Sequence, residues 1–250
     1  MKKYEFTGET KRTLWGAELH RIKAVIAFGI VEAGELGGWV EKEENLSHEG
    51  KAWVWGNAEV WGNAKVWGNA EVWGNAEVWG NAEVWGNAKV WGNAKVWGNA
   101  EVWGNAKVFS ASHVLVIGAI GSRTDFTTFY RDKDNEITVK CGCFLGKIDK
   151  FLEKVTRTHG DSKYALVYRA AVEVAKLQID LNMVEPLEVG DKVQIIGKEG
   201  NPSSNYNDKM EQYLGTVMTI ASVHRDGYRM EEDGGEWFWN NYRIAGKVEG

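Results

Sequence analysis

The sequence predicts a mainly β protein whose centre is a parallel β-solenoid. Nine consecutive copies of a six-residue unit, Val-Trp-Gly-Asn-Ala followed by Glu or Lys, run from Val54 to Lys107. A fixed period this short is typical of a solenoid, in which each repeat stacks on a later copy of itself. Helical spacing of apolar residues is confined to residues 148–179, while residues 187–250 show short strand patterns separated by turn residues.

Within one repeat, alternation predicts which side chains face the interior. Ala58 and Val60 are two positions apart and point to the same side of an extended segment, whereas Glu59 points to the other side. Gly62 and Asn63 supply the corner, because both residue types tolerate the left-handed backbone of a sharp turn. We therefore expect Ala and Val inside, with Glu, Lys and Trp outside or at the corners.

This spacing, with its Gly-Asn corners, resembles the hexapeptide-repeat family over roughly residues 46–117. The resemblance implies a left-handed parallel β-helix with three hexapeptides per coil, in which residues eighteen apart stack. Opposite charges would then meet, as with Glu71 and Lys89, although Glu83 and Glu101 would be alike. Trp side chains would form three ladders, namely Trp55, Trp73 and Trp91; Trp61, Trp79 and Trp97; and Trp67, Trp85 and Trp103.

Residues 1–45 are predicted to form an N-terminal β cap. Tyr4 to Phe6 and Leu19 to Val25 have the character of short strands, and Gly37-Gly38-Trp39 turns the chain into the first coil. A cap is required because an open rung exposes unpaired backbone groups. The segment from Leu36 to Ser47, together with the Gly-Asn-Ala repeats, resembles a group of bacteriophage and prophage proteins of unknown activity.

Residues 118–183 are predicted to form a small α+β domain that folds alone or against the last coil. Strand patterns at 126–130 and 137–144 precede two helices. The first helix carries apolar residues at helical spacing and ends at His159-Gly160, and the second begins after Asp161.

A candidate ligand site lies in the turn that begins at Gly121. Flexible backbone, hydroxyl groups and one guanidinium can wrap an anion, and an aromatic ring can stack on a base. The alternative interpretation is a tight turn between two strands. The predicted ligand-binding residues are Ser122, Arg123, Thr127, Thr128 and Tyr130.

Residues 187–250 form a third predicted domain, with five short strands that resemble an SH3-like barrel. Its aromatic residues can line a groove for a protein partner, or part of the set can build the core instead. Alternation places Trp237 and Trp239 on one side. The predicted partner-binding residues are Tyr206, Tyr228, Trp237 and Trp239.

Composition narrows the classes of function. The net charge is −5 and the charges alternate in sign, so we expect no nucleic-acid partner. The two cysteines, Cys141 and Cys143, lie too close for a disulfide framework, which favours a reducing compartment. We expect no membrane span and no secretion signal, and therefore a protein of the cytoplasm, which is the cytoplasm of the host cell if a phage encodes it. We also expect no metal and no cofactor.

These patterns favour a non-catalytic binding or scaffold protein that forms a homo-oligomer, and the resemblance described above implies one of phage type. That resemblance also implies a sharper hypothesis, an anti-defence protein that sequesters a host factor or a nucleotide signal, with Arg123 on the phosphate. One alternative is a hexapeptide-repeat acyltransferase that depends on His48 or His113, since many members of that family are acyltransferases. Another is a structural component of a virion or its assembly, with the Trp ladders holding copies together.

Overall fold

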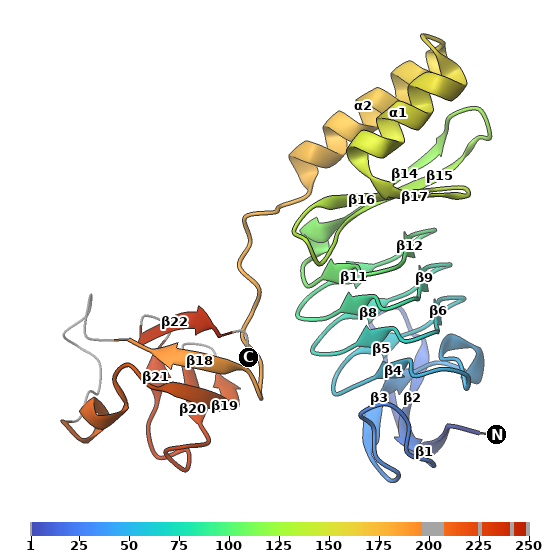
Figure 1. Cartoon of the computed structure of the whole chain (residues 1–250). Helices are drawn as coiled ribbons and strands as arrows, with labels where there is room; N and C mark the ends of the chain where they lie inside the picture. The colour runs from blue at the N-terminus through green and yellow to red at the C-terminus, as the bar shows by residue number, and fades with distance from the viewer. Residues whose placement is uncertain (1, 197–207, 225–226, 241–242, 249–250) are drawn as a thin grey trace. The chain divides into compact units, whose positions relative to one another are not determined.

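A computed structural model of the 250-residue chain describes residues 2–196, 208–224, 227–240 and 243–248. The chain divides into two units, Met1–Met183 and Val184–Gly250 (Figure 1). In the described residues, no helix is long and apolar enough to cross a bilayer.

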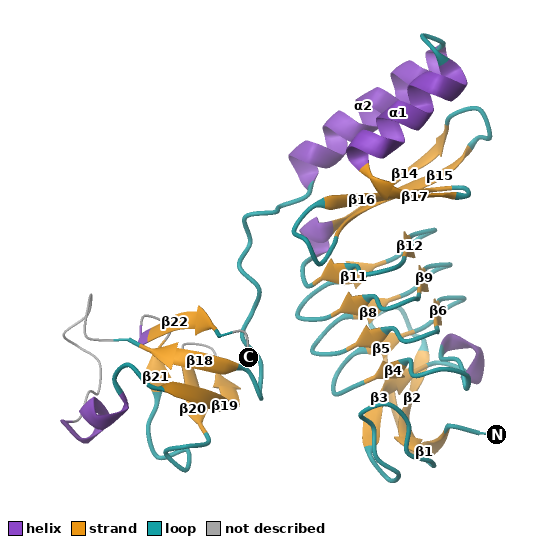
Figure 2. Ribbon diagram, in the orientation of Figure 1, coloured by secondary structure: helices purple, strands orange, loops and turns teal. Residues whose placement is uncertain are grey.

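The centre of the first unit is a parallel β-solenoid of about four turns, as predicted (Figure 2). Each repeat contributes one two-residue strand, and paired residues are eighteen positions apart, as with Val72 and Val90. The strands form three sheets, ordered β3-β5-β8-β11, β4-β7-β10-β13 and β6-β9-β12. Their bounds are β3 (Leu36–Val40), β4 (Trp53–Val54), β5 (Glu59–Val60), β6 (Lys65–Val66), β7 (Glu71–Val72), β8 (Glu77–Val78), β9 (Glu83–Val84), β10 (Lys89–Val90), β11 (Lys95–Val96), β12 (Glu101–Val102) and β13 (Lys107–Val108).

The interior of the solenoid consists of the predicted Ala and Val residues. The Val of every strand from β4 to β13 is fully buried, and so is the Ala that precedes each Glu or Lys. Charged residues between them face outward, where Lys89 lies 3.3 Å from the Glu71 carboxylate and Lys95 lies 3.2 Å from that of Glu77. Such exposed pairs contribute little stability, so the buried Ala and Val columns hold the coil together.

The three predicted Trp ladders are present. Each ladder contains a pair of rings that stack nearly parallel, with centroid separations of 5.1 Å for Trp61–Trp79, 4.9 Å for Trp73–Trp91 and 4.3 Å for Trp67–Trp85. At two ends the packing turns edge-on, and Phe109 continues the column above Trp91. Aromatic contacts of this kind contribute about 0.5–1.5 kcal/mol each beyond area burial.

The corner Asn residues form ladders of their own, which the sequence analysis did not anticipate. Asn63 Nδ2 donates to Asn81 Oδ1 at 3.1 Å, and Asn81 Nδ2 donates to Asn99 Oδ1 at 3.0 Å. The same contact joins Asn57 to Asn75, Asn69 to Asn87 and Asn87 to Asn105. Asn therefore stabilises each corner twice, through the turn and through its side-chain amide.

An antiparallel β cap covers the N-terminal end. β1 (Tyr4–Arg12) pairs with β2 (Glu18–Ala24), and β2 pairs with β3, which joins β5 of the solenoid in parallel. The Lys3 ammonium is buried and donates to the carbonyl of Ala52 at 2.7 Å, and burial lowers the pKa of Lys3 to about 8. The Tyr4 hydroxyl donates to the Leu46 carbonyl at 3.0 Å. Both side chains supply donors to carbonyl groups near the first rung.

A four-stranded antiparallel sheet and two helices cover the C-terminal end (Figure 1). One face of the sheet packs on the last coil, where the Glu101 amide donates to Thr128 Oγ1 at 3.0 Å. The other face packs on the helices through Phe129, Phe151 and Val172. The elements are β14 (Val114–Ile120), β15 (Asp125–Arg131), β16 (Ile137–Cys141), β17 (Phe144–Lys147), α1 (Ile148–His159) and α2 (Lys163–Gln178).

The second unit is a five-stranded antiparallel sheet with the order β21-β20-β19-β18-β22. Five short strands are as predicted, and buried residues such as Ile195, Met218 and Trp239 form a core of their own. The strands are β18 (Lys192–Ile195), β19 (Val217–His224), β20 (Gly227–Met230), β21 (Trp239–Asn240) and β22 (Ile244–Lys247), with a 3₁₀ helix at Asp208–Tyr213.

The corner glycines are close to the glycine of the next turn, which gives a test of the register. Gly80 and Gly98 have φ of +74° and +68°, so an Ala at either costs about 1–2 kcal/mol in backbone strain. A Cβ on Gly80 would also lie 3.0 Å from the Gly98 nitrogen, whereas a Cβ on Gly98 has no described atom within 4 Å. We expect Gly80→Ala to destabilise the protein by about 1–3 kcal/mol more than Gly98→Ala, in urea unfolding followed by Trp fluorescence. Equal losses would contradict this packing.

His113, between the solenoid and β14, is fully buried, and its Nδ1 accepts from the Phe109 amide at 3.4 Å. Burial, and then the Arg131 guanidinium, lower the pKa of His113 to about 4, against the opposing effect of Asp180.

The folded pKa of His113 therefore lies below the unfolded value of about 6.5, so the unfolded chain binds this proton more readily. Its contribution to stability is complete above pH 6.5 and falls by up to about 1.4 kcal/mol per pH unit toward pH 4. We expect His113→Gln to flatten the decline in unfolding free energy between pH 7 and pH 5, measured beside wild type. His48→Gln serves as the control, and the same slope in wild type and His113→Gln would contradict the assignment.

Candidate functional site

A basic pocket lies in the first unit, beside the turn that joins β14 to β15. Its volume is about 190 Å³. Its walls come from this turn, from the turn between β16 and β17, and from the two helices. The lining residues are Ser122, Arg123, Cys141, Cys143, Phe144, Phe151, Lys154, Val155, Thr158, His159 and Tyr168.

Two glycines allow the turns to come this close. Gly121 has φ of +73°, and a Cβ there would lie 1.8 Å from the Tyr168 hydroxyl. Gly142 has φ of +55°, and a Cβ there would lie 3.1 Å from Arg123 Nη1. The first glycine lets the β14–β15 turn approach α2, and the second lets the Arg123 side chain lie over the β16–β17 turn.

The chemistry of the lining is cationic. Three basic side chains, Arg123, Lys154 and His159, contribute to the pocket, and none of its lining residues is Asp or Glu. Burial, and then the neighbouring Cys141, raise the pKa of Tyr168 to about 12, so its hydroxyl stays protonated and able to donate. A pocket that combines cations with neutral donors attracts anions.

The two cysteines differ in exposure. Cys141 Sγ lies 3.3 Å from Thr127 Oγ1, which donates to it, and 3.8 Å from the Tyr168 hydroxyl. Cys143 is exposed, and both thiols are free. Within the described ranges, no three His, Cys, Asp or Glu residues gather so as to hold a metal ion.

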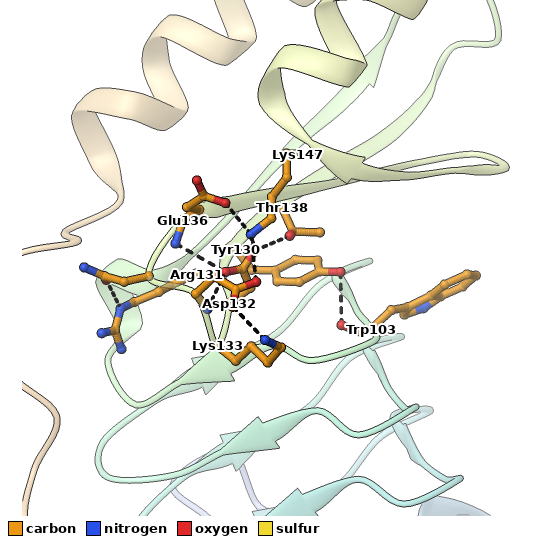
Figure 3. Close-up of polar contacts among 10 residues, drawn as sticks. Trp103, Tyr130, Arg131, Asp132, Lys133, Glu136, Thr138 and Lys147 are labelled. Carbon is orange, nitrogen blue, oxygen red and sulfur yellow. Dashed lines mark hydrogen bonds and ion pairs between the residues drawn. The ribbon is translucent and has the colours of Figure 1, made fainter. Parts of the chain in front are cut away.

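Only two of the five predicted ligand residues, Ser122 and Arg123, line the pocket. Thr127 and Thr128 are buried and bond to Cys141 and to the Glu101 amide. Tyr130 is also buried, and its hydroxyl donates to the Trp103 carbonyl at 3.1 Å (Figure 3). These three side chains belong to the packing of β15, which lies between the coil and the helices, so the candidate ligand set narrows to Ser122 and Arg123.

The helices contribute pocket residues that sequence reasoning missed. Lys154 and Thr158 are four apart on α1 and therefore share one face, and His159 ends that helix. This spacing was visible in the sequence. The packing of α1 beside the Arg123 turn was not, because it depends on contacts between segments far apart in the chain.

A second polar cluster surrounds the buried carboxylate of Asp132 (Figure 3). One carboxylate oxygen accepts from Thr138 Oγ1 and from the Lys147 ammonium, each at 2.5 Å, and Lys147 also lies 2.6 Å from Glu136. Burial disfavours the charge of Lys147, but hydrogen bonds to Asp132 and Glu136 outweigh it and raise the pKa of Lys147. This cluster is internally satisfied and fixes the hairpin of β15 and β16.

In the second unit, Trp239 is fully buried and its Nε1 donates to the Asp233 carboxylate at 2.7 Å. Trp239 is thus part of the core, while Tyr228 and Trp237 are partly buried against the same core. Tyr206 lies outside the described residues. The choice between groove and core is therefore decided for Trp239 alone.

The two histidines of the acyltransferase hypothesis lie at opposite ends of the solenoid. His113 is buried, as described above. His48 is half-buried, its Nδ1 accepts from the Lys3 amide at 3.2 Å, and its ring stacks on Tyr4 at 4.4 Å. Both rings therefore take part in the packing of the caps.

No family model and no curated protein sequence matches this chain. Its function must therefore be inferred from the chemistry of these sites.

The Asp132 cluster gives a test of the C-terminal cap. Lys147→Met removes the cation and leaves the buried carboxylate short of a partner, so we expect a loss of about 1–3 kcal/mol in unfolding free energy. Lys133→Met is the matched control, because Lys133 pairs with the exposed Asp134 and should change stability by less than about 0.5 kcal/mol. Indistinguishable urea midpoints for the two variants would count against a stabilising Asp132–Lys147 pair.

Proposed function

We propose that the protein is a non-catalytic binding protein in which a rigid solenoid carries an anion-binding pocket at its C-terminal end. The ligand class is a phosphate-bearing small molecule such as a nucleotide. The observation that carries the proposal is the convergence of Arg123, Lys154 and His159 on one pocket whose lining contains no carboxylate.

Each side chain has a role in this proposal. The Arg123 guanidinium grips two phosphate oxygens, and Lys154 adds a second positive charge. Ser122, Thr158 and the neutral Tyr168 donate hydrogen bonds. The volume of about 190 Å³ suits a phosphoryl group and part of a sugar, since pockets that enclose whole drug-sized ligands measure roughly 300–1,000 Å³. The remainder of the ligand then extends over the exposed Ser122 turn.

The wider assignments belong to the same proposal. A left-handed coil of three hexapeptides fits the eighteen-residue register, and an SH3-like barrel fits the five antiparallel strands of the second unit. Tyr228 and Trp237 remain its candidate contacts for a protein partner. The resemblance to phage proteins supports an anti-defence role in the cytoplasm of the host, as a homo-oligomer that sequesters a nucleotide signal or a host factor.

Thermal denaturation with a panel of mono-, di- and cyclic nucleotides, ADP-ribose and inorganic phosphate tests the pocket. A ligand at 100 times its Kd should raise Tm by about 5–10 °C. Arg123→Glu and Lys154→Glu should abolish the rise without lowering the Tm of the free protein. The control is Arg157→Glu, an exposed position of α1 that does not line the pocket.

Two outcomes would overturn this proposal. One is the absence of any shift with every member of the panel. The other is a shift that survives Arg123→Glu at full size, which would place the anion elsewhere on the protein.

A further inference from the structure

Neighbouring turns of the solenoid are joined by parallel β-ladders, in which amides donate in both directions between the two turns. The Trp79 amide donates to the Val96 carbonyl at 3.0 Å, and the Asn81 amide donates to the Gly98 carbonyl at 2.8 Å. These amides of one turn therefore point toward the following turn. At the C-terminal end of each sheet the last strand is left with amides and carbonyl groups that need partners.

The three sheets end differently. The last strand of one sheet, β12, receives an acceptor from the C-terminal cap, because Thr128 Oγ1 takes the Glu101 amide. On the sheet that ends with β11, no acceptor is present: among the described residues, the amides of Lys95, Trp97 and Asn99 have no hydrogen-bond partner. The chain should have supplied the next strand near residue 113, but it turns away there through the 3₁₀ helix Ala111–His113 and then pairs β14 with β15.

A groove of about 260 Å³ opens beside these amides. Lys95, Trp97 and Asn99 line one wall, while β14 and Phe126 line the other. Strand β14 is itself at the edge of its sheet, so the groove lies between two strand edges.

The groove also holds the open end of a Trp ladder. One face of the Trp97 ring lies against Trp79 at 6.0 Å, and the next position of the column is Leu115 rather than an aromatic residue. Trp97 is 60% exposed and Phe126 is 37% exposed. Such a pair of rings offers an apolar slot for one large side chain.

We propose that this groove docks an extended peptide segment of a partner protein, which adds a strand to β11. Carbonyl groups of the peptide accept from the amides of Lys95 and Trp97. An aromatic or large aliphatic side chain of the peptide packs between Trp97 and Phe126.

Complementarity of hydrogen bonding identifies the occupant. The Lys95 and Trp97 amides are two residues apart at β11, and this spacing of about 6.6 Å matches same-side carbonyls on an extended strand, whereas the Asn99 amide lies beyond the corner at Gly98. A phosphate gathers its acceptors around one atom and could meet only one of these amides. The groove shares no lining residue with the basic pocket, so the two sites can be tested independently.

The test uses the full-length protein and a displayed library of random twelve-residue peptides. Selected peptides should bind wild type and lose at least tenfold in affinity on Trp97→Glu and on Phe126→Glu. Trp67→Glu is the matched control, a partly exposed ladder Trp that does not line this groove. Hydrogen exchange by NMR should show slower exchange of the Lys95 and Trp97 amides when a peptide is bound.

Three results would overturn the proposal. The first is a selection that enriches no peptide, and the second is a set of enriched peptides that bind Trp97→Glu as tightly as wild type. A third is concentration-dependent self-association that Trp97→Glu abolishes, which would assign the groove to a second copy of this chain. Arg123→Glu should leave peptide affinity unchanged, so failure here stays separate from failure of the anion pocket.

Discussion

The backbone hydrogen bond between successive turns is the constraint on which the structure depends. Each turn is joined to the next by amide–carbonyl bonds in both directions, so each end of the solenoid presents backbone groups that need partners. Carbonyl groups need donors at the N-terminal end, and the Lys3 ammonium supplies one to Ala52. Amides need acceptors at the C-terminal end, and Thr128 supplies one to Glu101. Each cap therefore supplies side-chain partners to the end turn that it covers.

Side-chain ladders reinforce these backbone bonds, because the repeat places identical residues next to one another in successive turns. A Trp ring stacks on another Trp ring, and an Asn amide bonds to another Asn amide, whereas two neighbouring carboxylates repel each other. The like-charged pair Glu83 and Glu101 meets at the C-terminal end, where the Lys140 ammonium lies 2.8 Å from the Glu101 carboxylate and 4.0 Å from the centre of the Trp103 ring. The cap thus compensates this stack, one of three like-charged stacks with Glu59–Glu77 and Lys89–Lys107.

Both candidate sites lie where the repeat ends. Identical turns present identical surfaces, so a chemically distinct site requires a break in the period. The basic pocket is built on the sheet and helices of the C-terminal cap, and the β11 groove opens where the chain leaves the coil. The solenoid contributes rigidity and position, while the segments that interrupt it contribute the chemistry.

The sequence by itself determined the solenoid, its buried Ala and Val columns and its Trp ladders, because a six-residue period repeats local preferences that need no distant partner. It also located the Arg123 turn and the two helices. Only the tertiary structure decided that Thr127, Thr128 and Tyr130 face inward, that Lys154 and His159 join Arg123, and that the edge of β11 stays open. These outcomes depend on how α1, α2 and β15 pack against segments distant in the chain, and local periodicity carries no information about such contacts.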